Sequence, residues 1–210
     1  MDMDTASIAR LLLPFSPGLD EKQLHDISTY VDILQRWNQK INLTAVRDPE
    51  TIITRHFGES LFAARQLLGE GPETVSLVDV GSGAGFPGLP MKIYAPAIRL
   101  TLVEARQKRV AFLREVVRAL ALQDVNVFAA PAQDLDTPAD VVCLRAVEKF
   151  ARVLPVAAGL VAPSGRLALL IGSSQTEQVH AVLPRFSWSA PIPIPASHSR
   201  VLLVGIRNHP

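Results

Sequence analysis

A short apolar stretch, residues 75–80, carries an acidic residue, Asp79, near its end. Three glycines at alternate positions follow it, and they are Gly81, Gly83 and Gly85. The apolar stretch is typical of a buried parallel strand, and glycines after such a strand let the backbone take positive φ and approach a ligand. A helix is predicted just beyond, with free N–H groups facing the loop. The pattern predicts a nucleotide-like or carboxylate-bearing ligand at the carboxyl edge of a sheet.

Two cofactors compete for this loop. A dinucleotide fingerprint, G-x-G-x-x-G, counted from Gly81 meets Phe86 where the third glycine should stand. Counted from Gly83 it fits through Gly88, but Pro87 then occupies the turn into the helix. The acidic-x-G-x-G-x-G pattern of S-adenosylmethionine sites fits without a shift, and its carboxylate suits an ammonium better than a pyrophosphate. A tight turn without any ligand stays as the alternative.

Further candidates follow the next predicted strands. Glu104 comes directly after a strand at 98–103, where doubly wound folds place the acid that binds ribose hydroxyls. A glutamate that merely begins a helix is the alternative. The loop 131–134 follows a strand at 125–130, and its backbone is positioned to hold an adenine. A strand at 140–144 brings Arg145 to the same edge as the glycine loop.

The elements that position these residues fall into two groups. Apolar periodicity and cap signals predict helices at 5–13, 20–38 and 48–68 in a helical cap of residues 1–72. From residue 73 to 210, strands alternate with helices, which is typical of an α/β doubly wound parallel sheet. The remaining predictions are helices at 106–122, 150–161 and 176–183, a turn at 163–166, strands at 167–171 and 201–206, and an irregular proline-rich segment at 191–195.

Composition limits the partners. Lys and Arg number 21 against 20 acidic residues, so a basic surface for nucleic acid would have to be local. The densest run of basic residues begins at Arg106 and includes Arg109. A solvated helix face is the alternative for that run. The single cysteine, Cys143, excludes an internal disulfide and a Cys-rich metal site. The first residues do not resemble a signal peptide, and no segment reaches the roughly 20 apolar residues of a membrane span. We expect a cytoplasmic monomer without a metal or a membrane partner.

Given bound S-adenosylmethionine, the residues narrow the methyl acceptor. The Asn/Asp-Pro-Pro-aromatic motif of amino-group methylation is absent, because Arg145-Ala-Val stands in its place. Carbon methylation of pyrimidines needs a cysteine nucleophile, yet Cys143 lies within an apolar strand and is expected to be a buried hydrophobe. The N7 atom of guanine already carries a free lone pair, so its methylation requires alignment and no proton removal.

Several motifs together resemble a known family. They are Trp37-Asn-Gln-Lys-Ile-Asn-Leu-Thr44, Asp48-Pro49, Arg55-His56, Glu59-Ser60-Leu61, Asp79-Val-Gly-Ser-Gly-Ala-Gly-Phe-Pro-Gly-Leu-Pro90, Leu102-Val-Glu104, Lys108-Arg109, Phe112-Leu113 and Arg145-Ala-Val147. This set, spread from about residue 30 to 172, is similar to ribosomal RNA small-subunit methyltransferase G, also called glucose-inhibited division protein B. The resemblance implies a Rossmann-like class I methyltransferase sheet with an N-terminal helical extension. It also implies S-adenosylmethionine-dependent N7-methylation of one guanine in bacterial 16S ribosomal RNA, within the RNA or the 30S particle.

The resemblance assigns roles to individual positions. Those expected around the cofactor are Asp79, Gly81, Gly83, Gly85, Phe86, Glu104, Ala105, Ala132, Gln133 and Arg145. Arg145 is the expected catalytic residue, which orients the guanine or shapes the methionine end. The expected RNA contacts are Arg55, His56, Arg106 and Arg109, and a surface pair on a helix is the alternative for the first two.

Two departures from the family keep other functions open. The family's Gly/Ser-Arg-Ala/Val-Glu loop is replaced by Pro131-Ala132-Gln133, and its Leu-Lys-Gly strand end by Leu170-Ile171-Gly172. Both changes remove a cation that would suit RNA phosphate or base. A methyltransferase for another RNA or a small molecule is therefore one alternative. A cofactor-binding ribosome-assembly protein without turnover is the other.

Overall fold

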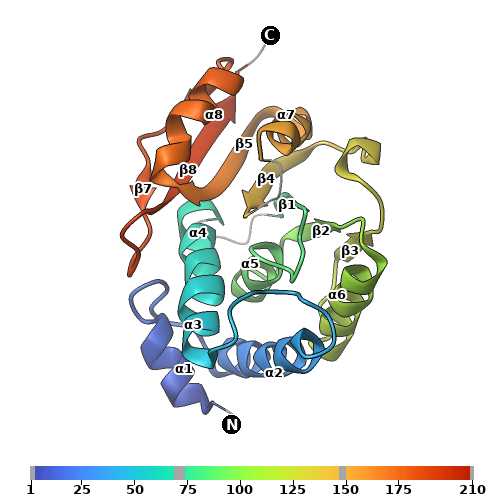
Figure 1. Cartoon of the computed structure of the whole chain (residues 1–210), viewed down its shortest axis with the longest axis vertical. Helices are drawn as coiled ribbons and strands as arrows, with labels where there is room; N and C mark the ends of the chain where they lie inside the picture. Colours follow the sequence, from blue (N-terminus) through green and yellow to red (C-terminus); the bar gives the residue numbers. More distant parts are fainter. Residues whose placement is uncertain (1–2, 69–73, 147–149, 209–210) are drawn as a thin grey trace.

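A computed structural model describes residues 3–68, 74–146 and 150–208. Their centre is a single sheet in which the strands lie in the order β3-β2-β1-β4-β5-β8-β6, and β7 pairs with β8 at one side (Figure 1). The strands are β1 (Ser76–Val80), β2 (Arg99–Val103), β3 (Val125–Phe128), β4 (Ala139–Arg145), β5 (Val161–Gly172), β6 (Phe186–Trp188), β7 (Ile192–Pro193) and β8 (Arg200–Arg207).

The first five strands are parallel, and β8 runs antiparallel to β5. The chain reverses direction across the sheet between β1 and β4, because β2 and β3 lie on one side of β1 and the later strands on the other. Ligands of open α/β sheets bind beyond the carboxyl ends of the strands at such a switch point. The loops after β1, β2 and β4, with their predicted site residues, all meet there.

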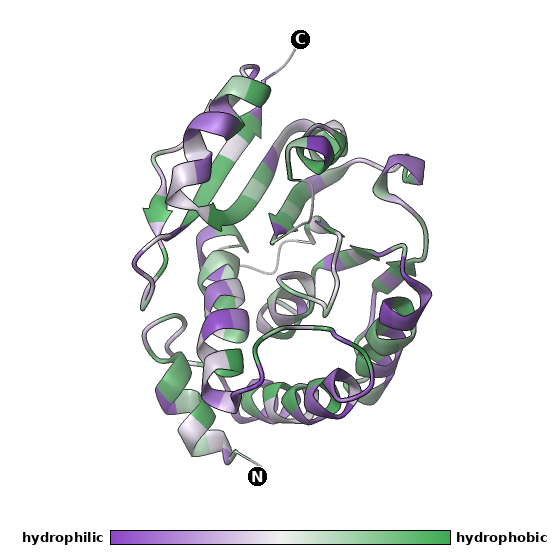
Figure 2. Cartoon of the chain, in the orientation of Figure 1, coloured by the Kyte–Doolittle hydropathy of each residue, from purple (hydrophilic) through white to green (hydrophobic). Residues whose placement is uncertain are grey.

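Helices cover both faces of the sheet. One apolar cluster joins α5 (Gly88–Tyr94) and α6 (Gln107–Ala119) with the N-terminal helices, and a second lies under α7 (Phe150–Gly159) and α8 (Thr176–Val182). The strands between these layers are among the most hydrophobic parts of the chain (Figure 2). Burial on both faces explains the apolar runs of the central strands β4 and β5, whereas β2 and β3, toward one edge, alternate apolar residues with Thr101 and Asn126.

The N-terminal helices are α1 (Thr5–Leu12), α2 (Glu21–Asn38), α3 (Pro49–Thr51), η1 (Ile52–Gly58) and α4 (Glu59–Leu68). The cap signals are confirmed: Asp20 and Gln23 form a capping box, and the Asp48 side chain accepts from Thr51 N–H. The last three segments form one continuous helix whose middle, η1, is π-helical. The sequence did not predict this widened turn, which is a form frequent at functional sites.

Aromatic packing joins these helices to the glycine loop. Tyr30 of α2 stacks on Phe86 with ring centroids 5.4 Å apart, and Phe57 of η1 meets both rings edge to face. The Tyr30 hydroxyl also donates to the Ala84 carbonyl. The boundary expected at 72/73, together with Gly69 and Gly71 predicted to end the helix, lies outside the described residues. The division into two domains therefore stays a prediction.

Two local predictions differ from the structure. The predicted turn at 163–166 is part of β5, where Ser164 takes φ +60° and the pairing with β4 shifts register between Ala139 and Val141. A β-bulge absorbs the Pro-Ser-Gly sequence without ending the strand. The proline-rich segment contributes the two-residue β7 at the edge of the sheet, where a proline costs no ladder hydrogen bond.

Candidate active site

The glycine loop leaves β1 at Val80, and its three glycines all have positive φ. At Gly83 (φ +57°) an added Cβ would meet no atom closer than 3.7 Å, with Gly81 O and Arg109 Nη1 at ordinary van der Waals distances, and the residue lines the Arg145 cavity described below. At Gly85 the same atom would lie 2.3 Å from the Tyr30 hydroxyl oxygen. Gly83 therefore leaves room for a ligand, whereas Gly85 is required by the packing of α2.

Five N–H groups of the loop, those of Ser82, Gly83, Gly85, Phe86 and Gly88, are occupied within the protein. Ser82 N–H donates to Val103, Gly83 N–H to the Glu104 carboxylate at 3.1 Å, and Gly88 N–H to Asp79 at 3.1 Å. The prediction of free N–H groups at the start of the following helix is wrong at Gly88, because Asp79 has taken that donor. A pyrophosphate is held by such free N–H groups, so this arrangement disfavours a dinucleotide.

Two cavities meet at Gly81 and Glu104. The first, here called the Arg145 cavity, has a volume of about 380 Å³ and is lined by Leu43, Thr44, His56, Gly81, Ser82, Gly83, Ala84, Phe86, Glu104, Arg106, Arg109, Arg145 and Ala146. The second, the Gln133 cavity, has about 560 Å³ and is lined by Val80, Gly81, Val103, Glu104, Ala105, Ala130, Pro131, Ala132, Gln133, Arg152, Val153 and Val156. Most of the predicted cofactor residues line one cavity or both.

Glu104 forms the ridge between the two cavities. Its carboxylate accepts from Gly83 N–H at 3.1 Å and from Arg106 N–H at 2.8 Å, and Arg109 Nη1 lies 3.7 Å from Oε2. The side chain is therefore held in one orientation at the end of β2. Each carboxylate oxygen can accept a second hydrogen bond, so a ribose hydroxyl remains compatible with these contacts.

Asp79 lies beneath the loop, where it is 1% exposed and lines neither cavity. Its Oδ2 accepts from Gly88 N–H, while Oδ1 has no hydrogen-bond partner among the described residues. Burial raises the pKa of the Asp79 carboxyl to about 7, against the hydrogen bond from Gly88 N–H, while the Ser82 hydroxyl donates to the Asp79 backbone carbonyl. An added Cβ at Gly88 would lie 2.8 Å from Asp79 Oδ2, so the two residues pack closely.

Arg145 is the centre of a buried ion-pair network. Its Nη2 lies 3.0 Å from Glu59 Oε2, 3.1 Å from His56 Nδ1 and 2.9 Å from the Arg55 carbonyl oxygen. The other oxygen of Glu59 lies 2.8 Å from Arg200 Nε, so one carboxylate bridges two guanidinium groups. Burial lowers the pKa of Arg145 despite the Glu59 charge, but a guanidinium keeps its proton in proteins.

The network comes from three distant parts of the chain. The continuous helix of η1 and α4 supplies His56, the Arg55 carbonyl and Glu59, β4 ends with Arg145, and β8 begins with Arg200. The guanidinium of Arg145 also lies 6.0 Å from the centre of the Phe86 ring. The arginine is thereby held beside Phe86 of the glycine loop, in the wall of the cavity that Glu104 also lines.

His56 is neutral in this environment. Burial, followed by the charges of Arg145, Arg55 and Arg200, lowers its pKa to about 3. Its Nε2 lies 2.8 Å from Thr44 Oγ1, and Nδ1 faces Arg145. Both ring nitrogens therefore have partners inside the protein.

The predicted RNA residues lie in two places. Arg106, Arg109 and His56 line the Arg145 cavity. The exposed Arg55 lines a different cavity of about 460 Å³, together with Glu59 and Arg200. The Arg145–Glu59–Arg200 network separates these two cavities, so Arg55 reaches the predicted site through its carbonyl and not through its side chain.

Sequence reasoning missed three contributors. Thr44 and Glu59 stood within motifs used for the resemblance, but nothing in the sequence assigned them contacts. Arg200 had no signal, because its partner Glu59 is far away in the chain. The departure at 171 has a structural counterpart: Ile171 is 3% exposed within the second apolar cluster and pairs with Val201 of β8, while the next residue, Gly172, pairs with Arg200. Val147, the end of the Arg145 motif, lies outside the described residues.

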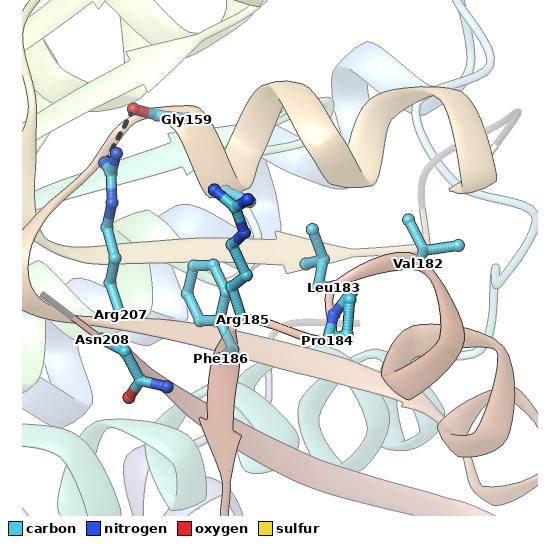
Figure 3. A pocket seen from close by; sticks show the side chains of 9 residues that line it. Gly159, Val182, Leu183, Pro184, Arg185, Phe186, Arg207 and Asn208 are labelled. Carbon is cyan, nitrogen blue, oxygen red and sulfur yellow. Dashed lines mark hydrogen bonds between the residues drawn. The ribbon is translucent and has the colours of Figure 1, made fainter. Parts of the chain in front are cut away.

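A larger cavity of about 860 Å³ lies away from these residues, between α7, α8 and β6 (Figure 3). Arg207 crosses it and donates from Nη1 to the carbonyls of Gly159 and Val161. Its walls are otherwise mainly apolar, from Val182, Leu183 and Phe186. It contains none of the residues predicted to carry chemistry.

The strand order, the antiparallel β8 and the glycine loop at the switch point define a class I S-adenosylmethionine-dependent methyltransferase fold. Solved structures agree. Magnesium protoporphyrin IX methyltransferase from Synechocystis PCC 6803, solved with bound SAM, has a TM-score of 0.66 over 92% of this chain and all of that one, at 15% identity. TYW2 from P. horikoshii, solved with MeSAdo, has a TM-score of 0.60 over 73% of this chain and 63% of that chain, at 14% identity.

Sequence comparison specifies the family. The model described as GidB, rRNA small subunit methyltransferase G, matches residues 23–192, so the chain belongs to this family. A ribosomal RNA small subunit methyltransferase G from Roseiflexus sp. (strain RS-1) is 37% identical over 89% of this chain and 84% of its own length. One from Xanthomonas oryzae pv. oryzae (strain MAFF 311018) is 39% identical over 79% and 76%.

Proposed function

We propose that this protein transfers a methyl group from S-adenosylmethionine to N7 of a guanine in small-subunit ribosomal RNA. One observation carries the proposal: the Arg145 cavity and the Gln133 cavity meet at Glu104, beside the open side of Gly83. Two joined cavities match a ligand with a nucleoside end and an amino-acid end. The family membership supports the RNA substrate.

The residues fit this cofactor. Ala132 and Gln133 would flank the adenine in the Gln133 cavity, Glu104 would accept from the ribose, and Gly81, Gly83 and Phe86 would border the methionine end. When bound, the cofactor supplies an electrophilic methyl group on a sulfonium. Asp79 is buried below the loop, so we propose that it shapes the loop through Gly88. A direct contact between Asp79 and the ammonium stays a prediction.

The polar groups around Arg145 suit an acceptor that loses no proton. His56 is neutral, and its two nitrogens are engaged by Arg145 and Thr44, so this imidazole is not free to act as a general base. N7 of guanine needs none, since its lone pair attacks directly. Arg145 would orient the base from the wall of the cavity, and alignment would then supply most of the acceleration.

RNA would approach over the outer rim of the same cavity. Arg106 is exposed at the start of α6 and Arg109 is half-buried beside it, so both can meet phosphates near the target base. Arg55 lies beyond the ion-pair network and would contact RNA farther from the reacting atom. Within the described residues no helix has the length and apolar character of a membrane span. We propose that the protein acts in the cytoplasm, as a monomer, on the RNA or the 30S particle.

The test is methyl transfer from labelled S-adenosylmethionine into small ribosomal subunits from a strain that lacks this activity. We expect label in the RNA, recovered as 7-methylguanosine after digestion. If label appeared only in another RNA or in a small molecule, that acceptor would be the substrate and the ribosomal assignment would be wrong. Binding of S-adenosylhomocysteine without turnover on any ribosomal particle would instead indicate a binding protein.

A further inference from the structure

The Thr44 side chain ends a short hydrogen-bond chain inside the Arg145 cavity. Arg145 Nη2 lies 3.1 Å from His56 Nδ1, and His56 Nε2 lies 2.8 Å from Thr44 Oγ1. All three residues line the cavity in which the glycine loop also lies. The proposed function uses Arg145 but gives the threonine no role.

Arg145 fixes which atoms donate and which accept in this series of hydrogen bonds. A guanidinium carries donors and no acceptor, so His56 Nδ1 must receive the hydrogen bond through its lone pair. A neutral imidazole with an unprotonated Nδ1 carries its hydrogen on Nε2. Nε2 therefore donates to Thr44 Oγ1, and the opposite direction would place two donors face to face at Arg145.

Thr44 Oγ1 accepts a second hydrogen bond. The N–H of Val46 donates to it at 3.1 Å. A hydroxyl oxygen has two lone pairs, and both are now used. What remains is the O–H itself, which has no acceptor within hydrogen-bond distance among residues 3–68, 74–146 and 150–208. The hydroxyl can thus offer a ligand in the cavity a donor only.

We propose that Thr44 is a specificity-determining residue that donates a hydrogen bond to O6 of the target guanine. This inference rests on the proposed function. Guanine presents O6 and N7 side by side as two acceptors, whereas adenine has an amino group in place of O6. The Thr44 donor therefore suits guanine, whose O6 is an acceptor. It disfavours adenine, because the hydroxyl would face the donor of the adenine amino group.

A bond to O6 leaves the neighbouring N7 lone pair free. In the transfer, that lone pair forms the N7–methyl bond while the methyl–sulfur bond breaks and its electrons stay on sulfur. The sulfonium becomes a neutral thioether, the guanine ring gains the positive charge, and no proton moves. The Thr44 donor sits next to the reacting atom without competing for it.

The experiment compares Thr44→Val, which removes the hydroxyl but keeps the branched shape, with Thr44→Ser, which keeps the hydroxyl. Thr137→Val is the matched control, since Thr137 is exposed and bonds only its neighbour Asp136 among the described residues. Each variant is assayed on small-subunit RNA carrying guanine at the target position, and on RNA carrying 2-aminopurine there, which has N7 but lacks O6. Calorimetry measures S-adenosylhomocysteine affinity in parallel.

We expect Thr44→Val to lower kcat/KM on guanine RNA by about 10- to 100-fold, as for a lost hydrogen bond that leaves a partner unpaired. On 2-aminopurine RNA the valine variant and the wild type should react alike, because the bond is absent in both. Affinity for S-adenosylhomocysteine should stay within about twofold in the valine variant, and the serine variant should retain wild-type rates within about threefold. A merely structural role of Thr44 would slow both RNAs equally.

Three results would overturn the proposal. They are an undiminished rate on guanine RNA in Thr44→Val, an equal loss on both RNAs, and a loss of cofactor affinity that accounts for the lost rate. The last would assign the hydroxyl to the carboxylate of the cofactor. Failure of the proposed function looks different, because the wild type itself would then form no 7-methylguanosine.

Discussion

The two ends of the joined cavities are built in different ways. At the Glu104 end, the positioning contacts are backbone N–H groups of Gly83 and Arg106, which lie in the loops that follow β1 and β2. At the Arg145 end, side chains of η1, α4 and β8 hold one another in an ion-pair network. The first end tolerates changes of side chain, whereas the second depends on each member.

This contrast agrees with the two departures from the family pattern. Pro131-Ala132-Gln133 lies at the Gln133 cavity, where contacts through the backbone survive a changed side chain. At the other end the network keeps a full set of charges, with Arg200 beside the strand end where Ile171 has become part of the core. We therefore expect substitutions at the Arg145 end to have the larger effects.

The largest effect is expected for Arg145→Ala. Methyl transfer should fall by about 1,000-fold or more, because the side chain that we propose orients the base is lost. The variant also leaves buried Glu59 with Arg200 alone, and breaking a buried pair costs about 3–5 kcal/mol. Denaturant unfolding and circular dichroism measure that cost. Wild-type rates in the folded variant would remove Arg145 from the site.

Gly83→Val tests the other end. The residue has φ +57° and lines the Arg145 cavity, so valine adds backbone strain of about 1–3 kcal/mol and a branched side chain at the proposed border of the cofactor. We expect calorimetry to show S-adenosylhomocysteine affinity weakened about 100-fold, which corresponds to about 2.7 kcal/mol. Gly159→Val is the control, because an added Cβ at Gly159 would meet no atom within 4 Å. Unchanged affinity in Gly83→Val would mean that the loop does not border the ligand.

Asp79 and His56 predict opposite dependences of stability on pH. The pKa of folded Asp79 is raised to about 7, so the folded state binds more protons than the unfolded chain between about pH 4 and 7, and this residue's contribution falls as pH rises through that range. The pKa of folded His56 is lowered to about 3, so its contribution rises between about pH 3 and 6.5.

Thermal unfolding of Asp79→Asn separates the contribution of Asp79 to the pH dependence of stability from that of His56. The variant cannot ionise at position 79, so the Tm difference, wild type minus variant, should shrink by several degrees from pH 5 to pH 8. A difference that grows over that range would show that the ionised carboxylate is the form the fold prefers.

The smallest effect is expected for Arg106→Ala on the rim. Loss of one phosphate contact should weaken RNA binding a few-fold and reduce the salt dependence of binding by about one charge. Binding is measured by filter retention between low and physiological salt, with S-adenosylhomocysteine affinity as the internal control. An unchanged salt slope would return Arg106 to the role of a solvated helix residue.

The cofactor end was largely predictable from sequence, for a physical reason. A strand, its glycine loop and the next strand's acid are short-range features, and parallel strands bring their carboxyl ends together in every fold of this class. The spacing from Gly81 to Glu104 thus predicted that the two residues meet at one edge of the sheet, and both line the two joined cavities. It did not reveal that Gly85 serves the packing of Tyr30, because the contact is made by a helix far earlier in the chain.

Sequence by itself therefore determined the alternation of strands and helices, the glycine loop and the family to which the chain belongs. Only the tertiary structure decided which groups meet at Arg145. The π-helical turn of η1 sets His56 against the arginine, the start of α4 supplies the bridging carboxylate, and β8 returns antiparallel to add Arg200. Such contacts depend on strand order and helix register over long separations, and neither quantity is encoded in the local pattern of apolar and polar residues.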